Sequence, residues 1–201
     1  MNKLLLNGYE LLTVLLAFAV LYGAMRHKSP ACRGAFSFIL LLAFAVYLCG
    51  ALHYTGAGTL YELLRRGFVL RPAAINLLPF SRRIDVAGYL LNIVLLLPFG
   101  MLAPLIWPRL RRIGRTAAAG ALFSLLIEIS QLFTSRRPDV DDLLLNTLGA
   151  VLGWLLYRLL PARLRERQQA CPFSPAWVVA LLFLGRFLLF DELGAVSLLY
   201  F

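Results

Sequence analysis

The sequence predicts an all-α fold, a polytopic transmembrane helix bundle of about six spans with an interfacial segment between spans 2 and 3. Three observations support this prediction. Of the 201 residues, 61% are hydrophobic and only 15% are charged. The mean hydropathy of +0.79 is that of a membrane protein and not of a soluble domain. The apolar residues form runs of roughly 17–25 residues, the length that a helix needs to cross bilayer hydrocarbon.

Six such runs follow one another, and each is expected to form one span. They are Leu4–Met25, Ala35–Tyr54, Gly88–Trp107, Thr116–Thr134, Leu143–Leu160 and Pro175–Phe190. The first contains Ala17-Phe18-Ala19, which loosely fits a signal-peptide cleavage pattern. Its apolar run continues to Arg26, so a retained span is expected. The last run is short and carries Arg186.

Basic loops predict how the bundle is oriented. The loops at 26–33, 109–115 and 158–167 are rich in Arg and Lys and lie on one side of the predicted bundle. Short basic loops stay in the cytoplasm, which places the N-terminus outside. The segment 55–87 is then external although it carries five arginines. Its mixture of basic and apolar residues predicts a segment in the membrane interface, where arginines meet lipid phosphates.

The net charge of +10 does not indicate a nucleic-acid partner, because the basic residues lie in short loops between apolar runs. The three cysteines have no paired spacing, so we expect no disulfide framework and no zinc site. Calcium or magnesium would suit the carboxylates near residues 128–146, but nearby arginines compete for them and no known loop spacing occurs. We therefore expect no metal and no cofactor.

A polar series around one short break interrupts the fourth and fifth runs. It consists of Glu128, Gln131, Arg136, Asp139, Asp142 and Asn146. An ionisable group within a membrane segment costs a few kcal/mol, so a functional or pairing role is the default hypothesis. Residues three or four apart share one side of a helix. Glu128 and Gln131 therefore lie on one stripe with Gly120 and Ser124, and Asp142 and Asn146 on another with Gly149 and Gly153.

The small residues of these stripes permit close packing of membrane helices, so we expect the fourth and fifth spans to hold their acids side by side. Asn92 and the segment Asn76–Arg83 face the same side in the predicted topology. Four segments thus bring polar groups to one outward surface, which we call the polar cleft. Its predicted ligand-binding residues are Asn76, Arg82, Asn92, Glu128, Gln131, Arg136, Asp139, Asp142 and Asn146.

The order and spacing of these residues resemble those of the VanZ-like family of bacterial membrane proteins. The motifs are Asn76-x-x-Pro79-Phe80, Asn92 with Pro98-Phe99-Gly100, Glu128-x-x-Gln131, and Arg136-x-x-Asp139-x-x-Asp142-x-x-x-Asn146-x-x-Gly149. They extend over about Ala73–Leu160. Pro138 and Val140 depart from the family, which more often has an aromatic or aliphatic pair there. The last span is not part of the motif.

The resemblance implies a multi-pass protein of the bacterial plasma membrane, related to a determinant of teicoplanin resistance, with no established catalytic mechanism. It suggests three regions. Residues 1–72 form two N-terminal transmembrane helices and the interfacial loop, residues 73–160 form a VanZ-like core with three transmembrane helices, and residues 161–201 form a basic loop and a C-terminal transmembrane helix.

Three functions are open to such a protein. The first is binding of membrane lipids or of a lipid-linked cell-envelope precursor at the polar cleft, which would alter glycopeptide susceptibility. The second is an enzyme acting on a lipid phosphate or peptidoglycan precursor, with Glu128 and Asp142 as candidate catalytic carboxylates. The third is a proton-coupled transporter. The charges gather near one face instead of crossing the midplane, which places this third hypothesis last.

Purely structural roles compete with these functions. Glu128 and Gln131 would then lie at the helix end, reach into water and pair with a neighbouring helix, and Asp139 or Asp141 would cap the fifth span. Glu10 and Arg186 would form an ion pair between the terminal spans.

Overall fold

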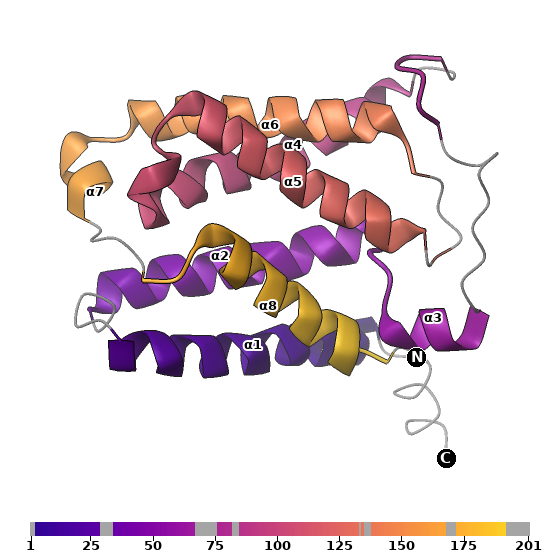
Figure 1. Ribbon diagram of the computed structural model, residues 1–201, viewed down its shortest axis with the longest axis horizontal. Helices are drawn as coiled ribbons and strands as arrows, with labels where there is room; N and C mark the ends of the chain where they lie inside the picture. The colour runs from indigo at the N-terminus through magenta and orange to yellow at the C-terminus, as the bar shows by residue number, and fades with distance from the viewer. Residues whose placement is uncertain are drawn as a thin grey trace.

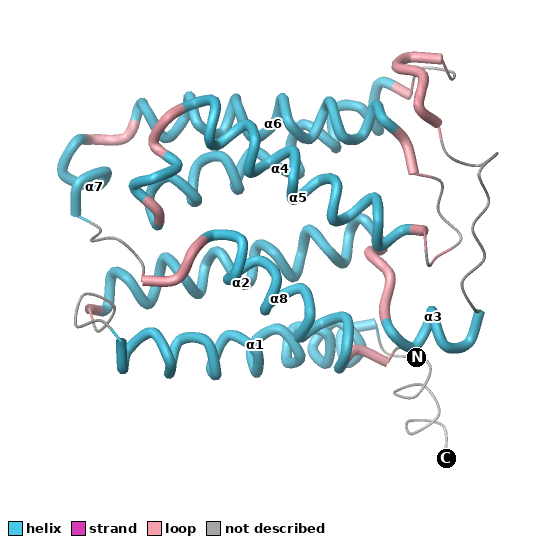
Figure 2. The backbone as a smooth tube through the Cα atoms, in the orientation of Figure 1, coloured by secondary structure: helices cyan, strands magenta, loops and turns pink. Residues whose placement is uncertain are grey.

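The computed structural model describes residues 3–28, 34–66, 76–81, 85–132, 134, 138–167 and 172–191. Within these ranges the chain is helical and has no strand (Figures 1 and 2). The helices are α1 (Lys3–Lys28), α2 (Ala35–Thr55), α3 (Leu60–Arg66), α4 (Val86–Ile106), α5 (Ile113–Gln131), α6 (Val140–Leu159), α7 (Ala162–Arg167) and α8 (Pro175–Leu189), with a 3-10 turn η3 (Pro108–Leu110). The predicted all-α fold is confirmed.

Five helices, α1, α2, α4, α5 and α6, are long and apolar enough to cross a membrane. Each coincides with one of the first five predicted spans. The sixth, α8, has 15 residues. At 1.5 Å per residue it rises about 22 Å, which is shorter than the roughly 30 Å of bilayer hydrocarbon. The described part of the bundle therefore contains five full-length candidate spans and one shorter apolar helix.

Acidic capping residues explain why two helices begin before their apolar runs. The Asp85 carboxylate accepts from the backbone N–H of Ala87 and starts α4 two residues earlier than hydropathy predicts. Asp139 does the same for α6, whose first turn contains Asp141 and Asp142. A capping carboxylate satisfies backbone amides that have no partner within the helix. Apolar pattern alone misses the first turn of α6 because it contains Asp141 and Asp142.

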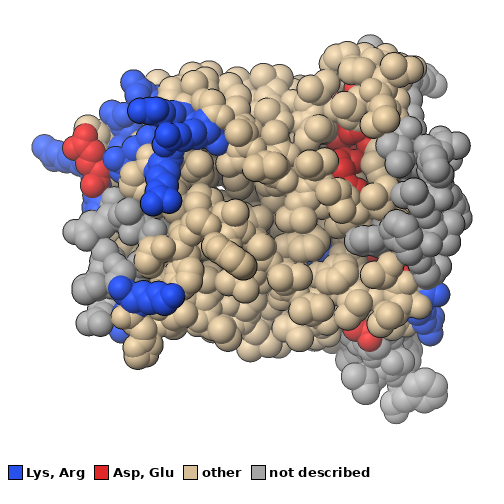
Figure 3. All heavy atoms as spheres, viewed as in Figure 1, with Lys and Arg blue, Asp and Glu red and all other residues tan. Residues whose placement is uncertain are grey.

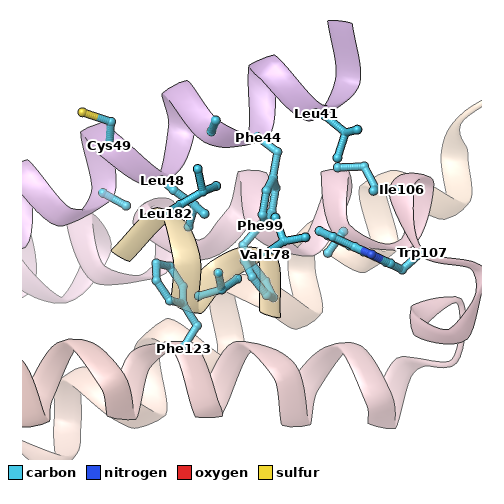
Figure 4. Close-up of a cluster of buried hydrophobic side chains, with 14 of the residues drawn as sticks. Leu41, Phe44, Leu48, Cys49, Phe99, Ile106, Trp107, Phe123, Val178 and Leu182 are labelled. Atoms are coloured by element: carbon cyan, nitrogen blue, oxygen red, sulfur yellow. The ribbon is translucent and has the colours of Figure 1, made fainter. Parts of the chain in front are cut away.

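The helices form two groups. α4, α5 and α6 pack together, α8 packs against α1 and α2, and contacts between α2 and α4 join the groups (Figure 1). Aromatic rings fill this junction (Figure 4). The Phe44 ring of α2 lies 5.9 Å from that of Phe99 in α4, which stacks 5.5 Å from Phe123 in α5. The core thus fixes the group of helices that carries the polar residues against the N-terminal pair.

Glycines set the closest helix contact, between α4 and α6. A Cβ atom on Gly149 would lie 2.0 Å from the backbone oxygen of Ile93, and one on Gly153 would lie 2.0 Å from that of Leu97. The sequence led us to expect that these glycines face α5, and that expectation is wrong. α5 does pack on α6, where Gly120 lies against Ala150, but the glycine pair faces α4. The backbones touch there because no side chain intervenes.

Basic residues dominate one end of the bundle, and acidic residues are present at the other. The described basic residues of the 26–28, 109–115 and 158–167 segments gather at one end, as the loop analysis predicts, and acidic residues are visible at the other (Figure 3). Helices α4 and α6 begin at the acidic end, and α5 ends there (Figure 1). The polar residues of these three helices are therefore at one depth.

Candidate polar cleft at the acidic end of the bundle

The segment 76–81 is fastened to the start of α6 through Asn76. Its N–H donates to the carbonyl of Pro138 at 3.0 Å, and its own carbonyl accepts from the N–H of Val140 at 3.0 Å. The Asn76 side-chain amide donates to Asp139 Oδ1 at 2.9 Å. Together these contacts make a single parallel bridge between Asn76 and Asp139.

The same segment is shaped by its own side chains and by Asp141. Asn76 Oδ1 accepts from Ser81 Oγ at 3.0 Å, which closes a turn that contains Phe80 at a φ of 54°. Asp141 Oδ1 accepts from the Phe80 N–H at 2.8 Å, and Asp141 Oδ2 accepts from the Tyr89 hydroxyl at 2.5 Å. A bulky residue adopts this left-handed backbone only when its surroundings hold it there. Asp141, at 2% exposure, is one of the groups that hold it.

These contacts separate the two acids that were expected to cap α6. Asp139 is the cap, since its Oδ1 accepts from the N–H of Asp141 at 3.0 Å. The same interpretation of Asp141 is wrong, because its side chain reaches Phe80 and Tyr89 instead. Sequence reasoning missed Tyr89. It lies three residues before Asn92 in α4, so helical spacing was the signal that could have found it.

Glu128 joins the end of α5 to the start of α6. Its Oε2 atom accepts from the backbone N–H of Asp139 at 3.0 Å, and the side chain is 7% exposed. Gln131, one turn further on, turns away to α2, where its Nε2 donates to the carbonyl of Thr55 at 2.8 Å. The expected pairing of both residues with a neighbouring helix is confirmed, but the expectation that they reach into water is wrong, because Glu128 is 7% and Gln131 4% exposed. Glu128 faces the polar cleft while it pairs in this way.

Two amides join the helices further along α4 and α6. Asn92 of α4 donates from Nδ2 to Asp142 Oδ1. Asn146 of α6 donates from Nδ2 to Ser124 Oγ of α5 at 2.9 Å, and its Oδ1 is buried without a hydrogen-bond donor among the described residues. A buried acceptor without a donor costs about 1–3 kcal/mol. A ligand hydroxyl, amine or water at this point would recover that energy.

A pocket of about 180 Å³ opens between the segment 76–81, the end of α5 and the start of α6, and Asn92, Asp142 and Asn146 are not among the residues that line it. Its polar edge is formed by Asn76, Glu128 and Asp139, and the rest of its wall is apolar. The apolar residues are Leu77, Leu125, Ile129, Leu132, Pro138, Val140 and Leu143. Leu77 and Ile129 are exposed on the outer surface of the bundle, at 76% and 46%. The pocket therefore offers hydrogen-bonding groups and an apolar wall side by side, which suits an amphipathic ligand.

The structure brings seven of the nine predicted cleft residues to one end of the bundle. Six meet near the start of α6, namely Asn76, Asn92, Glu128, Asp139, Asp142 and Asn146. Gln131 is at the same end but bonds to α2. Arg82 and Arg136 lie outside the described residues. Among the described residues, no group of three or more His, Cys, Asp or Glu side chains is placed to hold a metal ion.

A second polar cluster lies at the same end, between the terminal helices. Arg186 Nε of α8 donates to Glu10 Oε1 of α1 at 2.6 Å, which confirms the predicted ion pair. His53 Nδ1 of α2 lies 2.5 Å from Glu10 Oε2. Arg186 also donates from Nη1 to the carbonyl of Ala57 at 2.7 Å. Since both charges are buried and paired, this cluster ties α1, α2 and α8 together.

Comparison with known proteins gives a match to one family. The family model described as VanZ/LLP1 matches residues 38–161, from α2 to the end of α6. The matched region contains every described residue of the polar cleft, and it begins upstream of the Ala73 limit expected from the motifs. No curated protein and no solved structure matches this chain.

Proposed function

This chain belongs to the VanZ/LLP1 family, whose model covers more than half of its 201 residues, and we propose from that premise that its polar cleft binds a lipid of the cell envelope. The ligand would be a membrane-lipid headgroup or a lipid-linked cell-envelope precursor. The protein would act in the bacterial plasma membrane as a multi-pass binding protein. Binding at the outer face would change how a glycopeptide such as teicoplanin reaches its target.

One observation carries this proposal, namely the polar edge and apolar wall that share one pocket. A lipid has the same division between a hydrogen-bonding headgroup and apolar chains. The polar edge is formed by the Asn76 amide and by the Glu128 and Asp139 carboxylates, which favours a headgroup with hydroxyl or amine donors. The outward position follows from the basic loops at the opposite end, which the positive-inside rule assigns to the cytoplasm.

The fixed geometry of the cleft supports binding. The acids accept from backbone and amide donors of other segments, as Glu128 does from Asp139 and Asp142 from Asn92. Such cross-links hold the wall of a site in place before a ligand arrives. A preformed site loses less entropy on binding, which favours affinity.

The test is teicoplanin susceptibility of a sensitive bacterial host that expresses the chain. Wild type should lower susceptibility, and Glu128→Gln and Asp142→Asn should each restore it toward that of the empty host. Glu166→Gln, an exposed substitution in α7 at the other end of the bundle, is the matched control and should behave as wild type. Membrane protein levels are measured in parallel. Equal susceptibility of all strains at equal protein levels would refute the proposed link to teicoplanin.

A further inference from the structure

An apolar groove lies between α5 and α8 and extends from the basic end of the bundle to Leu126 of α5. Its volume is about 840 Å³, within the roughly 300–1,000 Å³ of ligand sites in proteins. The floor is formed by Phe99 and Phe123, and Leu122 and Leu126 of α5 face Val179 of α8 across it. No part of it involves the residues of the polar cleft.

The groove exists because the two helix groups do not close over each other there. α8 packs on α1 and α2, whereas α5 packs on α6. The walls carry small side chains where the helices face each other, Ala118 and Ala119 on α5 and Ala176 and Ala180 on α8. Larger residues would fill the space. With alanines, the bundle leaves an apolar channel that an unbranched hydrocarbon chain from the bilayer can occupy.

Two arginines mark one end of the groove. Arg109 of η3 and Arg115 in the first turn of α5 are exposed and line it together. Arg115 Nη1 donates to the carbonyl of Arg109 at 3.2 Å, which holds the two residues at the same place. They belong to segments of the basic end of the bundle (Figure 3), where the positive-inside rule leads us to expect the phosphates of the cytoplasmic leaflet. Guanidinium groups suit phosphate geometry.

We propose that this groove binds one anionic phospholipid of the cytoplasmic leaflet, with an acyl chain between α5 and α8 and the phosphate against Arg109 and Arg115. The apolar walls account for the chain, and the positive charge at a single end accounts for the headgroup. A zwitterionic lipid would fill the same groove but would gain less from the two arginines. A peptide is a poorer fit. Among the described residues that line the groove, polar side chains lie only at the arginine end, where α5 and α8 begin.

Native mass spectrometry of the purified full-length protein tests this proposal. The protein in detergent is mixed with equal amounts of phosphatidylglycerol and phosphatidylcholine that carry identical acyl chains. We expect one phosphatidylglycerol to be retained per chain in preference to phosphatidylcholine. The double variant Arg109→Gln/Arg115→Gln should lower the affinity for phosphatidylglycerol about tenfold or more, given roughly 1 kcal/mol for each basic residue near an anionic lipid. Its affinity for phosphatidylcholine should stay unchanged.

The matched control is Arg112→Gln/Arg158→Gln, which removes two exposed arginines of the same end that do not line the groove. It should keep the preference. Ala118→Trp, at an exposed position of the groove wall, should weaken binding of both lipids. Helicity measured by circular dichroism confirms that each variant is folded.

Equal binding of the two lipids to wild type, or unchanged selectivity in Arg109→Gln/Arg115→Gln, would overturn the proposal. A stable dimer without bound lipid would overturn it too, because a second copy would then cover the groove. The polar cleft is intact in all these variants, so a lipid bound there would remain, and the phosphatidylglycerol that Arg109→Gln/Arg115→Gln loses is the one in the groove.

Discussion

Asn76 and Asp139 are 63 residues apart in the chain, yet their side chains meet at 2.9 Å and their backbones form a parallel bridge. This pairing places the segment 76–81 over the first turn of α6. It also puts Asn76, Asp139 and Glu128 on one edge of the pocket. The contact between Asn76 and Asp139 therefore assembles this edge of the cleft. Substitutions at this contact test whether the edge depends on it.

Replacing Asn76 by Ala should loosen this edge. The change removes the donor to Asp139 and the acceptor for Ser81 and for the Leu78 N–H, while the backbone bridge remains. At about 1 kcal/mol net for each of these three hydrogen bonds, we expect a loss of about 3 kcal/mol in unfolding free energy. Denaturant titration in detergent measures it. Leu77→Ala, at an exposed neighbouring position, should cost less. Equal losses for the two variants would contradict the proposed role of Asn76.

Gly149→Ala should separate α4 from α6. The new Cβ atom would lie 2.0 Å from the Ile93 oxygen, and backbone cannot yield as a flexible side chain does. Overpacking of this kind costs about 1–3 kcal/mol. Gly23→Ala in α1 is the control, since nothing lies within 4 Å of its Cβ position and the helix should gain about 0.5–1 kcal/mol. A Gly149→Ala protein as stable as the control would show that the helices do not approach this closely.

Either half of the buried pair Glu10–Arg186 should be costly to remove alone. Glu10→Gln leaves the Arg186 charge buried, and a lone buried charge costs about 3–5 kcal/mol. The double variant Glu10→Gln/Arg186→Gln should be less destabilised than the sum of the two single variants. Unfolding free energies of all three give the coupling. Glu166→Gln on α7 is the exposed control and should be neutral. Strict additivity would argue against the ion pair.

Thr134 and Arg165 should be accessible from opposite sides of the membrane. Thr134 follows the end of α5 at the acidic end, and Arg165 lies in α7 at the basic end. In a background without the native cysteines, Thr134→Cys should react with an impermeant maleimide added outside intact cells. Arg165→Cys should react only after permeabilisation. Labelling of both positions from one side would refute the arrangement of spans.

The spans could be predicted from sequence because soluble domains rarely contain several apolar runs that are each long enough to cross a membrane. The Glu10–Arg186 pair was predictable because a charge within a membrane span is costly, so opposite charges in two spans are expected to pair. Helical spacing and the predicted topology also placed four polar residues at one end of the bundle, namely Asn92, Glu128, Asp142 and Asn146. These predictions depend on periodicity and on the cost of burying charge.

Contacts that depend on loops and on three-dimensional packing could not be predicted in this way. The contact of Phe80 with Asp141 requires the path of the chain between α3 and α4, which no periodic pattern encodes, whereas Tyr89 is three residues before Asn92 in α4 and could have been found by helical spacing. The choice of α4 as the partner of Gly149 and Gly153 depends on how three helices pack at once. Gln131 shared a stripe with Glu128, yet the end of α2 supplied a closer acceptor.

The most direct test of the polar cleft is photocrosslinking in living cells. A photoreactive amino acid is placed at Leu77, which is exposed and lines the pocket. The comparison position is Leu90 of α4, which is exposed at the same end of the bundle but does not line the pocket. Covalently captured lipids are identified by mass spectrometry. We predict that the probe at Leu77 captures one lipid or lipid-linked precursor at a level far above its proportion among the membrane lipids. Glu128→Gln should abolish this enrichment. The probe at Leu90 should capture bulk lipid. Capture of the same bulk mixture at both positions would contradict the central claim.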